Sequence, residues 1–214
     1  MIGVLGGTFD PIHFGHLRMA QELASSLRCQ AVFFVPTGTP PHRRHPWAGA
    51  RHRQEMVARA ISSNPLFVLD DREIRRPGLS FTVETLEEIK GELSSETLAL
   101  FVGADAWLAF PSWKKWQDIF SLAHVVVAHR PGFSLGAMDG GLKTEIERRL
   151  VHHPQALRLR PHGFIYYEPI TALDISASKI RGELSQGRSP RYLLPDAVLD
   201  YLETHRLYTR EERP

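Results

Sequence analysis

The fold is decided by a short apolar run, residues 2–5, and by the stretch after it, Gly6-Gly7-Thr8-Phe9-Asp10-Pro11-Ile12-His13-Phe14-Gly15-His16. An apolar run of this length indicates a buried strand, and the two glycines allow a sharp turn at its end. Apolar residues then recur at helical spacing over residues 15–27, which predicts a strand, a turn and a helix. Because His13 and His16 lie at the start of that helix, both imidazoles are expected to face one anion, held by the first helical amides.

The rest of the chain repeats this alternation of buried strands and helices. Further strands are expected at residues 31–35, 66–69, 98–102, 124–128 and 164–167, and further helices at 51–61, 81–93, 142–150, 176–184 and 195–205. Continuous apolar strands separated by helices are typical of an α/β fold, here a Rossmann-like doubly wound parallel sheet with helices on both faces. We expect a single domain over residues 1–209, with a helical C-terminal part at about 176–205 and a frayed tail at 210–214.

Composition excludes several classes of protein. The 214 residues include 43% hydrophobic and 23% charged residues, with a formal net charge of +2 and no long basic run, so nucleic-acid binding is not expected. The first apolar run is too short to span a membrane. Cys29 is the only cysteine, which excludes an intramolecular disulfide and a multi-cysteine zinc site and fits a cytoplasmic location. Whether the protein is a monomer or a homodimer stays open.

The ligand of the His13 and His16 pair is predicted to be phosphate. Neither a Gly-x-Gly-x-x-Gly fingerprint nor a Walker Gly-Lys-Ser/Thr follows the first strand. Zinc is the alternative, but no His-Glu-x-x-His pattern and no obvious third ligand accompany the two histidines. The turn therefore predicts a nucleotide-binding protein that uses neither the dinucleotide fingerprint nor the Walker motif.

Two motifs carry a resemblance to a known family. The first is His13-Phe14-Gly15-His16, and the second is Ile175-Ser176-Ala177-Ser178-Lys179-Ile180-Arg181. In this order they resemble the His-x-Gly-His and Ile-Ser-x-Ser/Thr-x-Ile/Val-Arg signatures of the nucleotidyltransferases related to class I aminoacyl-tRNA synthetases. Unaided, Ser176 is a suitable N-cap and Arg181 can fork onto phosphate. The resemblance implies an ATP site formed by Gly6, Gly7, Thr8, Phe9, His16, Gly103, Asp105, Ile175, Ser176, Ser178 and Arg181.

Further segments point to the acceptor. They are Pro40-Pro41-His42-Arg43, Ser80-Phe81-Thr82, Gly103-Ala104-Asp105, Phe110-Pro111-Ser112-Trp113-Lys114 and His129-Arg130-Pro131-Gly132. Together they resemble the bacterial nicotinate-nucleotide adenylyltransferases over residues 6–208. The resemblance implies transfer of AMP from ATP to nicotinate mononucleotide, giving nicotinate adenine dinucleotide and pyrophosphate in NAD biosynthesis. The implied acceptor residues are Thr37, His42, Phe81, Thr82, Asp105, Trp113, Lys114 and Arg130.

The family also implies roles at the triphosphate. His13, His16, Arg43 and Arg181 are expected to bind it, with His16 the more important histidine, and Mg²⁺ is expected to be held by the ATP phosphates without protein side chains. The chain departs from the family at Phe81, where an aromatic hydroxyl is common. Phosphopantetheine or nicotinamide mononucleotide as acceptor, a non-catalytic nucleotide sensor, and an RNA-binding role remain as alternatives.

Overall fold

The computed structural model describes residues 1–41, 45–129, 140–171 and 173–209. The strands are β1 (Ile2–Gly7), β2 (Ala31–Pro36), β3 (Phe67–Leu69), β4 (Leu98–Gly103), β5 (His124–His129), β6 (Leu150–Val151) and β7 (Ile165–Pro169). The α-helices are α1 (Phe14–Leu27), α2 (Ala50–Ile61), α3 (Arg72–Arg75), α4 (Thr82–Glu92), α5 (Ala104–Leu108), α6 (Gly140–Arg149), α7 (Ala177–Ser185) and α8 (Asp196–Thr204). Short 3₁₀ helices lie at Phe110–Ser112, Asp118–Ser121 and Pro154–Leu159. Within the described ranges, no helix combines the length and the apolar character needed to cross a membrane.

The described strands form a seven-stranded sheet in the order β3-β2-β1-β4-β5-β7-β6. The pairs β1–β4, β4–β5, β5–β7 and β6–β7 are parallel, with Val4 opposite Leu100 and Phe101 opposite Val126. The order of the strands reverses between β1 and β4, and ligands of open α/β sheets bind beyond the carboxyl ends of strands at such a switch point. The turn that follows β1 therefore starts at the location predicted for a ligand site.

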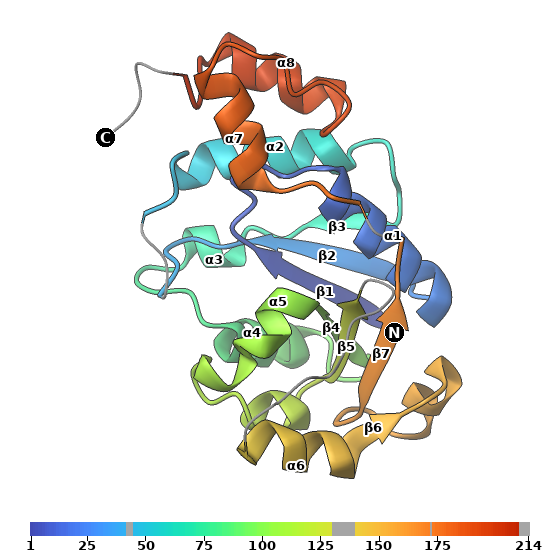
Figure 1. The fold of residues 1–214 in the computed structure, drawn as a ribbon. Coiled ribbons are helices and arrows are strands. Elements are labelled where there is room, and N and C mark those ends of the chain that lie inside the picture. The colour runs from blue at the N-terminus through green and yellow to red at the C-terminus, as the bar shows by residue number, and fades with distance from the viewer. Residues whose placement is uncertain (42–44, 130–139, 172, 210–214) are drawn as a thin grey trace. The chain divides into compact units, whose positions relative to one another are not determined.

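The contacts divide the chain into two compact units. Unit 1 consists of Met1–Leu5, Met19–Phe33 and Phe81–Ala172. Its core is the row of strands β4, β5 and β7, which lie side by side in Figure 1. The apolar runs of β4 and β5 are buried almost throughout. Helix α5 packs against both strands, and α4 buries Val83, Leu86 and Ile89.

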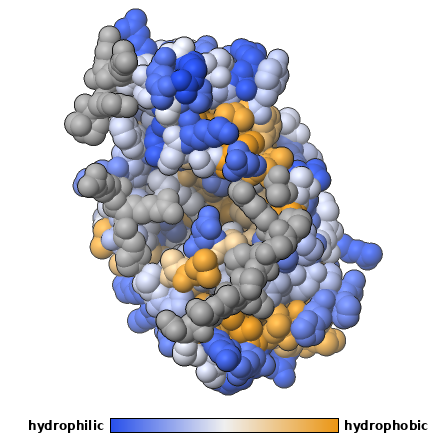
Figure 2. Space-filling view, in the orientation of Figure 1, coloured by the Kyte–Doolittle hydropathy of each residue, from blue (hydrophilic) through white to orange (hydrophobic). Residues whose placement is uncertain are grey.

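Unit 2 consists of Gly6–Arg18, Phe34–Ser80 and Leu173–Pro214. Helix α2 packs against α8 and β3 there, burying Met56 and Val57 of α2 together with Val198 and Leu202 of α8. The outer surface over α8 is mainly hydrophilic (Figure 2), as expected for the solvent side of an amphipathic helix. Unit 2 also contains both signature motifs.

The predicted α/β fold is confirmed, with most element bounds within one or two residues of the prediction. The helix expected at residues 142–150 instead covers Gly140–Arg149, and Leu150 begins β6. The helices α3 and α5 were not predicted, because four- and five-residue helices are too short for an apolar period to appear. The prediction of a single domain stays a prediction, and the tail 210–214 lies outside the described residues.

Candidate functional site

His13 and His16 form a stacked pair at the start of α1. Their ring centroids are 3.8 Å apart with an interplanar angle of 25°. The ring of Phe9 packs edge-on against His16, with centroids 5.1 Å apart. Phe9 adopts a φ of 49°, which is uncommon for a residue other than glycine and brings its buried ring back beneath the turn. The two histidines that the sequence paired are thus brought together, and Phe9 supports them.

Both imidazoles are held neutral in the free protein. Burial lowers the pKa of His13 to about 4. Burial, and secondly the neighbouring His13, lowers the pKa of His16 well below its usual value. The backbone N–H of His13 donates to Nδ1 of His16 at 3.3 Å, so neutral His16 carries its hydrogen on Nε2. The pair therefore offers hydrogen-bond donation to an anion and not a permanent positive charge.

Gly15 is required at its position because the His13 ring lies against it. A Cβ built on Gly15 would be 3.0 Å from Cε1 and Nδ1 of His13 and 3.7 Å from the carbonyl oxygen of Ile175. This glycine of the first signature thus lies close to Ile175, where the second signature begins. The close approach explains why the motif has glycine between its histidines.

Two of the first N–H groups of α1 do not behave as the sequence predicted, because they are not available to hold an anion. The N–H of Phe14 donates to the carbonyl of Leu193 at 3.0 Å, and the N–H of His16 donates to the carbonyl of His13 at 3.0 Å. These two amides already have protein acceptors, so the expectation that the helix start holds the anion does not apply to them. Anion binding at this end falls mainly to the side chains.

The glycine turn itself is tied to the residue after β2. The N–H of Thr37 donates to the carbonyl of Gly7 at 2.9 Å, which places the half-buried Thr37 beside the predicted ATP turn. Gly6 is exposed and has open space around it, whereas a Cβ on Gly7 would meet the ring of Phe9 at 3.0 Å. Thr8 lies between them and Phe9, half-buried. The predicted residues 6–9 and Thr37 thus form one continuous turn region.

The second signature begins α7 as predicted. The Ser176 side chain accepts a hydrogen bond from the N–H of Lys179 at 3.2 Å, which confirms it as the N-cap. Arg181 donates to Ser178 Oγ at 3.2 Å and to the carbonyl of Asp10, and its guanidinium lies 3.7 Å from the Asp10 carboxylate. Arg181 is thus held against Asp10, in the turn that precedes the first signature, by groups of the protein itself.

Of the predicted acceptor residues, Phe81, Thr82, Asp105, Trp113 and Lys114 belong to unit 1, whereas Thr37 belongs to unit 2. Thr82 is the first residue of α4, and Nζ of Lys114 lies 4.1 Å from the ring centroid of Phe81 and 2.7 Å from Oε1 of Glu84. Trp113 is half-buried, with its ring 5.1 Å from that of Phe110. The sequence did not anticipate the contact between Lys114 and Phe81, although both residues were in the predicted set.

Two further predicted site residues of unit 1, Gly103 and Asp105, lie at the carboxyl end of β4. Gly103 ends that strand and precedes α5, and Asp105 is exposed in the first turn of this helix. An exposed carboxylate at that edge of the sheet is available to hydroxyl groups of a ligand. His42, Arg43 and Arg130 were also predicted, and they lie outside the described residues.

Sequence reasoning missed a buried charged residue, Arg53, that contacts the turn after β1. Arg53 on α2 is 1% exposed and donates to the carbonyl oxygens of Thr8, Gly38 and Ala48. No sequence signal marks it, because an arginine on an amphipathic helix is usually solvent-exposed. Its hydrogen bonds fix the backbone around the predicted ATP turn.

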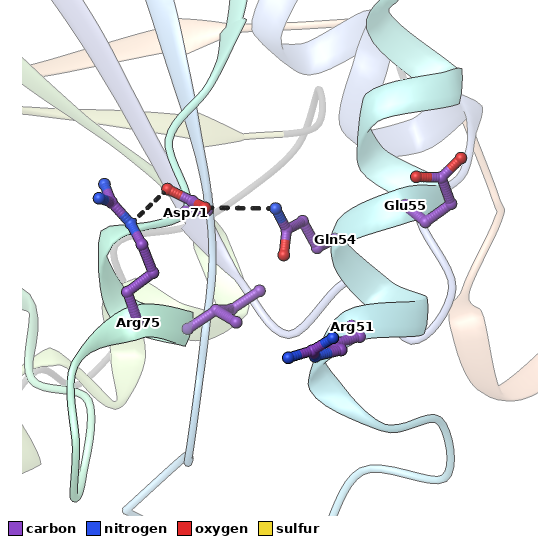
Figure 3. A pocket seen from close by; sticks show the side chains of 6 residues that line it. Arg51, Gln54, Glu55, Asp71 and Arg75 are labelled. Atoms are coloured by element: carbon purple, nitrogen blue, oxygen red, sulfur yellow. Dashed lines mark hydrogen bonds and ion pairs between the residues drawn. The ribbon is translucent and has the colours of Figure 1, made fainter.

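One open hollow lies elsewhere in unit 2, between α2 and α3. It is lined by Arg51, Gln54, Glu55, Asp71, Ile74 and Arg75. As Figure 3 shows, Asp71 accepts from Arg75 at 2.8 Å and from Gln54 at 3.3 Å. None of these residues was predicted to bind a ligand, and Asp71 and Arg75 form an ion pair within the hollow. Within the described residues, no group of three or more His, Cys, Asp or Glu side chains is arranged to hold a metal ion.

Comparison with known proteins identifies close relatives. The cytidylyltransferase-like family profile matches residues 4–183. A protein of Halorhodospira halophila named "Probable nicotinate-nucleotide adenylyltransferase" is 48% identical over 92% of this chain and 90% of its own. One of the same name from Dechloromonas aromatica is 45% identical over 97% of each chain.

A solved structure supports the fold. The Plasmodium falciparum nicotinic acid mononucleotide adenylyltransferase complexed with NaAD has a TM-score of 0.73 and covers 97% of this chain and 96% of its own, at 18% identity. At this identity the likeness concerns the fold alone.

Proposed function

The chain belongs to the cytidylyltransferase-like family, among its nicotinate-nucleotide adenylyltransferases, and we propose that it transfers AMP from ATP to nicotinate mononucleotide, forming nicotinate adenine dinucleotide and pyrophosphate. The observation that carries the proposal is the stacked pair of His13 and His16 beside the start of the second signature. Such a pair, with the guanidinium of Arg181 held nearby against Asp10 in the same unit, suits a triphosphate.

The reaction makes one bond and breaks one. A phosphate oxygen of the mononucleotide attacks the α-phosphorus of ATP, and the bond from that phosphorus to the oxygen bridging it to the β-phosphorus breaks. The bonding electrons leave with pyrophosphate. Such a transfer needs little covalent help from protein groups, so alignment of the phosphates and stabilisation of their charge are the main tasks of the enzyme.

His16 and Arg181 are the residues of this chain that we assign to charge stabilisation. Nε2–H of His16 donates to a phosphate oxygen, because its Nδ1 already accepts from the His13 backbone. Arg181 supplies the permanent positive charge that the neutral imidazoles lack. His13 keeps the His16 ring in place by stacking and contributes a second donor. Arg43 is proposed for the same phosphates from its place in the family pattern.

The acceptor is assigned to the residues around α4 and α5. The nicotinate ring stacks on Trp113, its carboxylate is met by Thr82 at the positive N-terminal end of α4 and by the Lys114 backbone, and Asp105 binds ribose hydroxyls. A carboxylate at a helix N-terminus is favoured over a neutral amide, which is why the acid is proposed in preference to nicotinamide mononucleotide.

Mg²⁺ is proposed to accompany ATP. Imidazole and guanidinium donors at the signature fit a polyphosphate and not a bare cation, so the ion is assigned to phosphate oxygens and water. When bound, it supplies charge neutralisation at the phosphates. We further propose a cytoplasmic location.

A pyrophosphate-release assay tests the proposal. Purified protein with ATP and Mg²⁺ is offered nicotinate mononucleotide, nicotinamide mononucleotide or phosphopantetheine, with EDTA as a control that should abolish turnover. Turnover fastest with the first acceptor is expected. No turnover with any acceptor, or a preference for phosphopantetheine, would refute it, and a preference for the amide would refute the choice of the acid.

A further inference from the structure

Arg53 donates hydrogen bonds to three separate segments around the turn after β1. The residue is 1% exposed, and its guanidinium donates to Ala48 at 3.1 Å, Thr8 at 2.8 Å and Gly38 at 3.0 Å, each time to the backbone carbonyl. Thr8 belongs to the turn after β1, Gly38 follows β2, and Ala48 precedes α2. A buried cation that satisfies three carbonyls fixes their spacing, because leaving any of its N–H groups unpaired is costly.

The carboxylate of Asp10 makes a second set of bonds in the same place. Its two oxygens accept from the N–H groups of Trp47 at 2.9 Å and Ala48 at 3.0 Å. The hydroxyl of Tyr208 donates to the same carboxylate at 2.6 Å. Asp10 and Tyr208 are both buried. A residue near the end of the described chain thus contacts the turn that precedes the first signature.

Tyr208 is held as a hydrogen-bond donor. Burial, and then the charge of Asp10, raise the pKa of the Tyr208 hydroxyl far above its usual value. The O–H therefore stays protonated, and its bond to a carboxylate is of the stronger, charge-assisted kind.

Asp10 connects this network to the second signature. Its carbonyl accepts from Arg181, and its carboxylate lies 3.7 Å from the same guanidinium. The backbone N–H of Trp47 is the group that donates to this carboxylate. The ring centroid of the Trp47 indole lies 5.8 Å from the Arg181 guanidinium. A shift of Asp10 would move the proposed phosphate-binding cation as well as the turn between Thr8 and His13.

We propose that Tyr208 and Arg53 are positioning residues for ATP: through Asp10 and the Thr8 carbonyl they hold the signature turn and Arg181 in the arrangement that binds the triphosphate. The inference rests on the proposed function. Neither residue belongs to a signature motif, and each acts through groups that it contacts directly. For Tyr208 the effect is therefore expected on the nucleotide and not on the acceptor, whereas Arg53 also holds Gly38, the neighbour of the predicted acceptor residue Thr37.

The test uses the full chain and measures binding separately from turnover. Tyr208→Phe removes only the hydroxyl and keeps the ring. Its matched control is Tyr192→Phe, at a tyrosine that is 82% exposed in the same unit. Arg53→Lys keeps the charge but loses the fork, and Arg51→Lys on the exposed side of α2 is its control. Calorimetry gives the Kd of a non-hydrolysable ATP analogue and of nicotinate mononucleotide for each variant.

For Tyr208→Phe and Arg53→Lys we expect the analogue Kd to rise about three- to thirtyfold, as for residues that act through their neighbours. The acceptor Kd of Tyr208→Phe and the Kd values of both controls should stay within twofold. Adding Tyr208→Phe to Asp10→Ala should cause little further loss, because Asp10→Ala already removes the acceptor of the Tyr208 hydroxyl. An analogue Kd within twofold of wild type for Tyr208→Phe would overturn the inference, and so would equal losses for both ligands that track a fall in Tm.

The design separates this inference from the proposed function. If the wild-type protein binds the analogue but turns over no acceptor, the proposed function fails while the Kd values still decide the roles of Tyr208 and Arg53. If the wild-type protein turns over and the variants bind normally, only the positioning inference fails. If the wild-type protein does not bind the analogue, both fail.

Discussion

The imidazole of His13 lies against the Cα of Gly15, so closely that a Cβ added to the glycine would be 3.0 Å from two atoms of the ring. The same ring stacks on that of His16, with the two ring centroids 3.8 Å apart. His13 thus contacts both the backbone of Gly15 and the ring of its partner. A methyl group at residue 15 would require the His13 ring to shift.

Gly15→Ala is expected to lower kcat/KM about tenfold or more while the protein stays folded, because small displacements of reacting or binding groups cost large factors in rate. The added methyl must displace the His13 ring and with it His16. Pyrophosphate release and a melting curve measure the two effects. Gly91→Ala on α4 is the control, since its new Cβ meets nothing within 4 Å. It should raise Tm slightly and leave kcat/KM unchanged. Full activity in Gly15→Ala would show that the stacked arrangement is dispensable.

Loss of the His16 donor should be more damaging than loss of His13. We expect His16→Ala to reduce kcat/KM by about 100-fold, the usual cost of removing one donor to developing charge. His13→Ala should cost less, because it removes the stacking partner but leaves the Nε2–H donor of His16. Steady-state kinetics of both variants decide the order. A change within about twofold in His16→Ala, roughly 0.4 kcal/mol, would contradict its assignment.

The sequence was sufficient for the fold because the central strands β4 and β5 are buried on both faces. Continuous apolar runs such as Leu98–Gly103 and His124–His129 leave no ambiguity about type, and helical spacing identified α1, α2 and α4. Short elements such as α3 and β6 could not be found in this way. Their existence depends on neighbours that are distant in the chain, and they are too short for a period to appear.

The sequence also predicted many residues of the candidate site, but it did not predict the contacts that hold them in place. The motifs located His13, His16 and Arg181, and the capping rule located Ser176. The pairing of Asp10 with Tyr208 joins residues 198 positions apart. Nothing in the local sequence of either residue encodes such a contact, which exists only because the folded chain brings the two segments together.

Trp113 is predicted to contribute to acceptor binding alone. Trp113→Ala should raise the KM for nicotinate mononucleotide about tenfold, the value of roughly one aromatic stacking contact. The KM for ATP should change by less than twofold. Trp113→Phe is the matched control, since it keeps an aromatic plane against Phe110 and should retain most of the affinity. Equal increases in both KM values would instead identify Trp113 as part of the packing around Phe110.

The stability of the protein is expected to fall in mild acid, in part because of His124. Its Nδ1 accepts from the N–H of Phe164 at 3.1 Å and its Nε2 lies 3.1 Å from the carbonyl of Arg160, so the folded protein holds a neutral ring. Burial lowers the pKa of His124 to about 4.

Because that pKa is below the unfolded value, the unfolded chain takes up the proton first as the pH falls. His124 therefore contributes stability that is fully present above about pH 6.5 and is lost towards pH 4, on the order of 3 kcal/mol in total. Urea unfolding between pH 4.5 and 7.5 (about the range of this titration) should show a shallower decline for His124→Gln than for wild type. His152→Gln, at an exposed histidine, should keep the wild-type slope. Parallel curves for wild type and His124→Gln would mean that this histidine is not held neutral by the fold, and that the acid sensitivity comes from His13 and His16, whose pKa values burial also lowers.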